Sequence, residues 1–157
     1  MKTLLNFLGA AALIVAFAGC EEDEVLDKMV INGITTTELP DTNDDGEPWD
    51  SDGTEPDFFL IIKSNGTNLE TTEIMKDTLA SSELNFTEGF PISISNTRDV
   101  VDIDIWESDA GEEDDEDSDF VGRVSFIPDF YTDQPTIVQA KDLEDIRVVV
   151  STSWEYK

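Results

Sequence analysis

Nine carboxylates lie between Glu107 and Asp119, and no lysine or arginine stands among them. Like charges crowded into one segment repel and raise each other's pKa values, so such a segment either spreads out in water or holds a cation. Apolar, strand-like runs flank it on both sides, at 101–106 and 120–127. The pattern indicates an acidic loop between two strands, and these two possibilities stay open for it.

A second acidic segment, residues 41–57, holds eight carboxylates. Together the two segments contain 17 of the 37 acidic residues in 30 positions. Charge that served only solubility would be spread more evenly over the surface. Within this segment Asp41, Asn43 and Asp45 alternate before Gly46, and alternating oxygens around a glycine turn can wrap a hard cation. Two interpretations stay open: both segments are solvated and free of calcium, or they share ions at one end of the fold.

The first twenty residues have the features of a secretory leader. A short basic start precedes an apolar run, residues 4–18, that is too short to span a membrane comfortably. The small residues Ala18 and Gly19, followed by Cys20, resemble the lipobox of bacterial lipoproteins, with Phe17 where leucine is most common. The resemblance implies that residues 1–19 are a signal peptide and that Cys20 carries the lipid. The alternative is an ordinary leader with an incidental cysteine.

Residues 20–27 are expected to be the lipidated cysteine and an acidic tether. The run Glu21-Glu22-Asp23-Glu24 resembles a surface-export tag of some Gram-negative lineages, and a solvated spacer is an equal alternative. We therefore expect a lipid-anchored protein of the outer membrane, on its periplasmic or its outer face. Because Cys20 is the only cysteine, packing or bound ions must stabilise the domain without a disulfide.

The charge of the chain excludes some partners. Without residues 1–19, eight basic residues face 37 acidic ones, a net charge of −29. Nucleic acid needs clustered lysine and arginine, so it is not an expected partner. Direct, ion-free binding to anionic lipid is disfavoured for the same reason.

The apolar pattern is that of β-structure throughout residues 28–157, a length that suits one domain. Short apolar or alternating runs are separated by turn signals, among them Asn65-Gly66, and one helical turn is allowed for around 78–82. The pattern favours an antiparallel β-sandwich of eight strands. The expected strands are 28–37, 58–63, 68–75, 90–95, 101–106, 120–127, 136–140 and 146–154.

The two acidic segments, in this order around these strands, resemble the calcium-binding loops of a C2 domain, an eight-stranded β-sandwich. Trp49-Asp50 followed by Pro56-Asp57-Phe58-Phe59 resembles the first loop of that family, with the usual Asp-Pro order reversed. Trp106-Glu107-Ser108-Asp109, followed by Asp119-Phe120-Val121-Gly122, resembles the third loop, with Glu107 in place of an aspartate. The resemblance covers residues 28–156.

The resemblance implies calcium as the cofactor and a set of carboxylate ligands from both loops. A rigid sandwich is needed because carboxylates from separate loops converge only where the loop roots are held close together. The resemblance also implies an additional ligand position, which Asp115 or Asp117 could fill, and we name Asp117 as the candidate. The implied calcium ligands are Asp50, Asp57, Glu107, Asp109 and Asp119, with Asp52 and Asp117 as further candidates.

Several other residues are expected to be structural. Asp102 and Asp104 alternate with apolar neighbours and are interpreted as outward residues of a strand, not as ligands. The tryptophans, at positions 49, 106 and 154, are expected to pack in the core or at its rim.

We do not expect an enzyme. Histidine is absent, the only cysteine is the candidate lipidation site, and no serine lies in a nucleophile motif. Three hypotheses follow. The first is a lipid-anchored module that binds calcium and through it attaches to anionic phospholipid, lipopolysaccharide or a protein. The alternative is a structural or accessory outer-membrane lipoprotein in which calcium only stabilises the fold or is absent. The third is a carboxylate-based glycan hydrolase.

Overall fold

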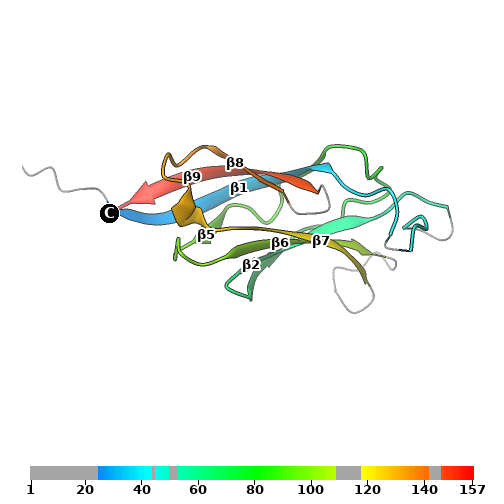
Figure 1. Ribbon diagram of the computed structural model, residues 1–157, viewed down its shortest axis with the longest axis horizontal. Coiled ribbons are helices and arrows are strands. Elements are labelled where there is room, and N and C mark those ends of the chain that lie inside the picture. The colour runs from blue at the N-terminus through cyan, green and yellow to red at the C-terminus, as the bar shows by residue number, and fades with distance from the viewer. Residues whose placement is uncertain (1–24, 44, 50–52, 109–117, 142–145) are drawn as a thin grey trace, which may run out of the picture.

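The computed structural model of the chain describes residues 25–43, 45–49, 53–108, 118–141 and 146–157. These residues form nine strands and one short 3₁₀ helix, arranged as two antiparallel sheets packed face to face (Figure 1). The predicted all-β sandwich is therefore confirmed. None of the helices within the described ranges is long and apolar enough to cross a membrane.

The first sheet has the order β4-β1-β9-β8 and contains β5 as well. Both β4 and β5 pair with the same long strand, β1, at successive positions: β4 at Ile34–Thr36 and β5 at Met29–Ile31. β4 and β5 are thus two pieces of one interrupted edge strand. This is why the structure has nine strands where eight were predicted. The bounds are β1 Leu26–Glu38, β4 Leu84–Phe86, β5 Ile92–Ile94, β8 Ile137–Lys141 and β9 Arg147–Tyr156.

The second sheet has the order β3-β2-β6-β7. Its hairpin β2–β3 turns at Asn65 and Gly66, both with positive φ (48° and 77°), as the common two-residue hairpin turn requires, so the predicted Asn-Gly turn is confirmed. The bounds are β2 Phe58–Ser64, β3 Thr67–Thr71, β6 Val101–Ser108 and β7 Ser118–Phe126.

The helical turn that the sequence allowed around residues 78–82 is not found. That segment contains a hydrogen-bonded turn, in which the Ser82 N–H donates to the Leu79 carbonyl at 2.8 Å. The short helix lies elsewhere, at η1 Pro128–Phe130, where a proline opens the first turn.

The core fills the space between the two sheets. Alternate residues of each strand point inward, as the pleat of a strand dictates, and on β6 these are Val101, Ile103 and Ile105, all fully buried. Phe58 of the neighbouring β2 is also fully buried. Burying one such side chain contributes about 1.5–3 kcal/mol, so this row of residues fixes the position of the strand ends that follow it.

Candidate metal site at the acidic end

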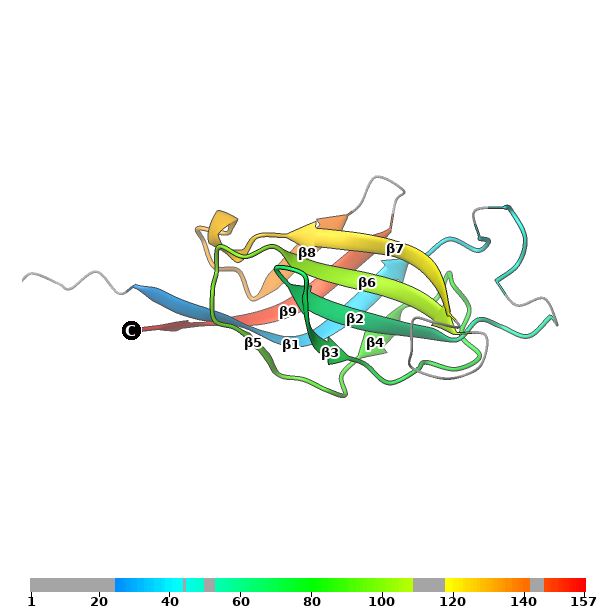
Figure 2. The same cartoon turned by 90° about the horizontal axis from the view of Figure 1, so that it is seen from below.

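Four strand termini meet at one end of the sandwich, which we call the acidic end. β1 ends there at Glu38 and β2 begins at Phe58, while β6 ends at Ser108 and β7 begins at Ser118 (Figure 2). Residues 41–57 join the first pair and residues 109–117 join the second. The fold therefore brings the roots of both acidic segments to the same end, although about fifty residues separate them in the sequence.

Three of the predicted ligands lie at adjoining strand ends of the acidic end. Phe58, Glu107 and Asp119 stand opposite one another on β2, β6 and β7. Residues opposite each other across antiparallel strands have side chains on the same face of the sheet. Asp57 directly precedes Phe58, and its N–H donates a long hydrogen bond, 3.4 Å, to Oε1 of Glu107.

Glu107 is buried because it continues the inward alternation of β6. It follows Ile103 and Ile105 at two-residue steps, so it faces the mouth of the core, and its side chain is fully buried. Asp119 is exposed at the rim of the same row. In this row, Glu107 thus lies inside the mouth of the sandwich and Asp119 at its edge.

The root of the first acidic segment is fixed by hydrogen bonds. Oδ1 of Asp57 accepts from the Asp77 N–H at 2.7 Å, and the Pro56 carbonyl accepts from the Thr78 N–H at 2.9 Å. Asp77 has a positive φ of 50°, which places its N–H against the carboxylate. The position of Asp57 is therefore set before any ligand binds, which reduces the conformational cost of binding.

A shallow hollow of about 190 Å³ joins the first acidic segment to β7, and it is lined by Asn43, Asp45, Trp49, Asp119 and Phe120. Trp49 anchors the segment, because it is 7% exposed and its Nε1–H donates to the Pro40 carbonyl at 2.8 Å. Oδ1 of Asn43 accepts from the N–H groups of Asp45 and Glu47, at 3.1 and 3.0 Å, which shapes the turn. Asn43 and Asp45 were not among the predicted ligands, although their alternation in the sequence was the available signal.

The other predicted ligands, Asp50, Asp52, Asp109 and Asp117, lie outside the described residues, as do Asp115 and the candidate lipidation site Cys20. Within the described ranges, no three or more acidic, histidine or cysteine side chains are grouped closely enough to hold a metal. Asp57, Glu107 and Asp119 have the hard oxygen donors that calcium prefers, but these three do not form a complete site on their own.

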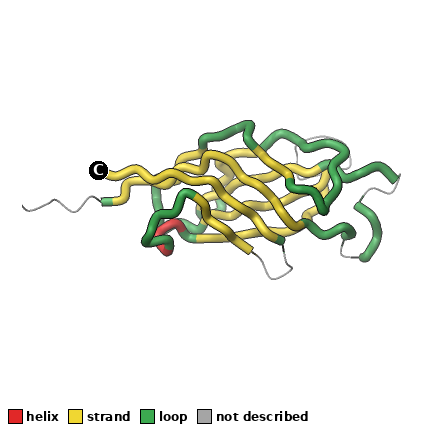
Figure 3. Tube along the Cα trace, turned by 90° about the horizontal axis from the view of Figure 1, so that it is seen from above, coloured by secondary structure: helices red, strands yellow, loops and turns green. Residues whose placement is uncertain are grey.

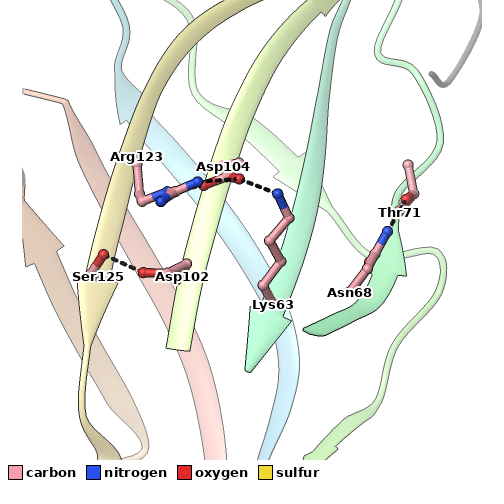
Figure 4. Close-up of polar contacts among 7 residues, drawn as sticks. All are labelled: Lys63, Asn68, Thr71, Asp102, Asp104, Arg123 and Ser125. Carbon is pink, nitrogen blue, oxygen red and sulfur yellow. Dashed lines mark hydrogen bonds and ion pairs between the residues drawn. The ribbon is translucent and has the colours of Figure 1, made fainter. Parts of the chain in front are cut away.

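Asp104 has a structural role, as the sequence indicated, but it is buried and not exposed. Figure 4 shows it on the outer face of β6, between Lys63 of β2 and Arg123 of β7. Lys63 Nζ lies 2.8 Å from Oδ2, and Arg123 donates through Nε and Nη2 to both carboxylate oxygens. Burial raises the pKa of Asp104, but the hydrogen bonds and charges of Arg123 and Lys63 outweigh it and hold the pKa below its ordinary value.

Asp102 is the half-exposed partner of this cluster and accepts from the Ser125 hydroxyl at 2.5 Å. On the edge strand β3 of the same sheet, Asn68 Nδ2 donates to the Thr71 hydroxyl at 3.4 Å (Figure 4). The contacts of Asp102 and Asp104 connect β2, β6 and β7 across their outer face, while the Asn68–Thr71 bond lies within β3. They are structural contacts, and none of them involves a residue of the acidic end.

The packing roles predicted for the other two tryptophans agree with the structure. Trp106 makes an edge-to-face contact with Phe120, with ring centroids 5.1 Å apart. Trp154 packs against the core and donates from Nε1 to the Pro135 carbonyl at 2.8 Å.

Two larger hollows, of about 440 and 370 Å³, lie over the other sheet. The larger one is lined by residues of β1, β8 and β9 that include Lys141 and Arg147, and the other by mostly uncharged residues of β1, β4, β8 and β9. None of their described lining residues is a carboxylate. Of the predicted ligands that the structure describes, Asp119 alone lines one of these three hollows, the smaller one at the acidic end.

No protein-family profile and no curated protein matches this chain. Solved structures do. A structure described as a C2 domain matches with a TM-score of 0.54 and 11% identity, over 82% of this chain and 97% of that one. The fold is C2-like. Two structures of human GIVD cytosolic phospholipase A2, both with a fluorophosphonate inhibitor and one also with terbium chloride, match this chain with TM-scores of 0.56 and 0.54.

The phospholipase matches have 14% and 16% identity and cover 85% and 82% of this chain. This chain spans only 18% and 17% of those proteins. At such identities the similarity establishes the fold alone. It confirms the C2-like sandwich that was predicted from the two acidic segments.

Proposed function

We propose that this chain is an exported, lipid-anchored, non-catalytic module that binds calcium at the acidic end of its C2-like sandwich and uses the bound ions to attach to an anionic partner. The observation that carries the proposal is the row formed by Phe58, Glu107 and Asp119, with Asp57 beside it, at the roots of both acidic segments.

Electrostatics supports a cation at this end. Two segments with 17 carboxylates between them begin and end on neighbouring strand ends, so their mutual repulsion disfavours the compact fold unless something offsets it. Calcium takes six to eight oxygens in flexible geometry, which suits carboxylates drawn from several loops. Asp57, Glu107 and Asp119 would supply ligands from the strand ends, and Asp50, Asp52, Asp109 and Asp117 would supply them from the loops.

A bound ion would also reverse the local charge. Without calcium, the acidic end repels phosphate groups; with calcium, open coordination positions attract them. Suitable partners are anionic phospholipid, the phosphates of lipopolysaccharide and an acidic protein surface. The terbium chloride of one similar phospholipase structure supports a hard-cation site by analogy only.

The proposed function is tested by calcium-dependent pelleting of residues 21–157, which contain every described strand, with anionic vesicles and with lipopolysaccharide. We expect binding in calcium, none in chelator, and at least tenfold weaker binding for the double variant Asp57→Asn, Asp119→Asn. A matched control, Asp129→Asn with Asp133→Asn, removes the same charge at the opposite end of the sandwich and should pellet like the wild type.

Two outcomes would count against the attachment role. If calcium raises the melting temperature but neither probe pellets, calcium only stabilises the fold, which is the accessory-lipoprotein alternative. If both double variants lose binding equally, net charge and not the acidic end is responsible.

A further inference from the structure

The end of the sandwich opposite the acidic end differs from it in chemistry. The described residues begin there with Val25, which exchanges both backbone hydrogen bonds with Lys157 at 3.2 and 3.0 Å. η1 lies at this same end, as the views in Figures 1, 2 and 3 agree, with the 3₁₀ helix in red in Figure 3. We call this end the tether end, because the segment that leads from Cys20 joins it.

Exposed apolar side chains gather at the tether end. Val25 and Tyr156, at the tip of the β1–β9 ribbon, are 58% and 43% exposed. Phe130 of η1, at 77%, is the most exposed large apolar side chain in the described ranges. Val100 precedes β6 at the same end, and η1 is held beside that loop by a hydrogen bond from the Asp129 N–H to the Thr97 carbonyl. These four residues, Val25, Val100, Phe130 and Tyr156, define the apolar surface considered below.

Three ion pairs lie at the tether end. Lys157 pairs with Asp27, Lys28 with Glu155 at 3.1 Å, and Arg98 with Asp129 at 3.5 Å. Exposed pairs of this kind stabilise little, but they bring three of the eight basic residues of the mature chain to this end. The tether itself adds Glu21, Glu22, Asp23 and Glu24, so this end is negative as well. It still has fewer carboxylates than the 17 of the two acidic segments, and an anionic surface repels it less than it repels the acidic end.

The distance to the anchor is short. Only four residues separate Cys20 from Val25, so even a fully extended chain spans no more than about 18 Å between them. β1 has 13 residues and is about 40 Å long at the usual rise per residue. An anchor at Cys20 thus holds the tether end against the lipid surface, while the acidic end approaches that surface only if the domain lies flat.

We propose that Val25, Val100, Phe130 and Tyr156 rest on the lipid surface that holds Cys20, and that the acidic end points away from it toward partners beyond that surface. This inference rests on the lipid anchor of the proposed function. It assigns the apolar tether end to the anchoring bilayer and leaves the calcium-loaded end for a partner in solution or on another surface.

The test uses the full-length lipidated protein in vesicles of phosphatidylethanolamine and phosphatidylglycerol, with chelator present so that the acidic end cannot attach to them through calcium. Phe130→Cys, Tyr156→Cys and the matched control Phe120→Cys are each labelled with an environment-sensitive fluorophore. Phe120 is also an exposed phenylalanine, 49%, but it lies at the acidic end. If Phe120→Cys disturbs the contact with Trp106, Glu55→Cys replaces it as the control. Wild-type protein should take up no label, since a lipidated Cys20 has no free thiol.

We expect headgroup-linked quencher lipids to quench the labels at 130 and 156 several-fold more strongly than the label at 120. Equal or stronger quenching at 120, or no quenching at any position in protein that floats with the vesicles, would overturn the inference but leave the anchor intact. Protein that takes up label at Cys20 and does not float would remove the lipid anchor, so this inference and the anchored part of the proposed function would fail together. The calcium-dependent attachment, which is tested on residues 21–157, would be unaffected.

Discussion

Replacing Asp104 by asparagine is expected to lower the free energy of unfolding by about 2–3 kcal/mol. The change leaves the cations of Lys63 and Arg123 without the buried carboxylate that they share. Breaking a buried ion pair costs about 3–5 kcal/mol, and we place this variant below that range because the Arg123 side chain is 47% exposed and can turn to water. Urea unfolding of both proteins at pH 7 measures the difference.

The pH dependence of that difference gives a second readout. Because the pKa of Asp104 is lowered in the folded state, its contribution to stability is fully present above the unfolded value of about 3.9 and is lost as pH falls through the lower folded-state pKa. The gap between wild type and variant should therefore close in strong acid. Asp102→Asn is the matched control, and it should cost less than about 1 kcal/mol because Asp102 is half-exposed. Equal losses in the two variants, or a gap that stays constant with pH, would contradict the assignment.

Replacing Phe58 by alanine is expected to cost about 4 kcal/mol, the largest stability effect among the variants considered. Its side chain is fully buried in the core, and truncating a core phenylalanine typically costs 3–5 kcal/mol. The same change should weaken calcium binding, because Phe58 directly follows Asp57 and stands in one row with Glu107 and Asp119.

Phe130→Ala is the control for this prediction. With 77% of its side chain exposed, it should change the free energy of unfolding by no more than about 0.5 kcal/mol. Thermal melting with and without calcium measures both effects. A Phe58→Ala protein that melted like the wild type would mean that the strand end is not held by the core in the way described.

Much of the fold could be predicted from periodicity. The alternation of Val101, Ile103 and Ile105 predicts β6 and its inward face, and Asn65-Gly66 predicts the hairpin beside it. β4 could not be predicted, because three residues, Leu84–Phe86, show too little alternation and form a strand only by pairing with β1. The ends of β1 also extend beyond the predicted range, since its pairing with β9 continues across three irregularities in register.

The candidate site was predictable in part. The position of Glu107 in the mouth of the sandwich follows from the same two-residue step that buries Ile105, so the sequence contained that signal. The burial of Asp104 did not follow from alternation. It depends on Lys63 and Arg123, which lie 41 and 19 residues away and come beside Asp104 only through the strand order β2-β6-β7. The hydrogen bond from Asp77 to Asp57 is a tertiary contact of the same kind.

Calorimetric titration of residues 21–157 with calcium tests the central claim most directly. The account predicts saturable binding at roughly 10⁻³ M or tighter, as in extracellular calcium modules, together with a higher melting temperature that chelator reverses. The Asp57→Asn, Asp119→Asn protein should lose most of that heat. Absence of both heat and a melting shift in the wild type would contradict the account: the acidic segments would then be solvated loops on a C2-like sandwich that binds no calcium.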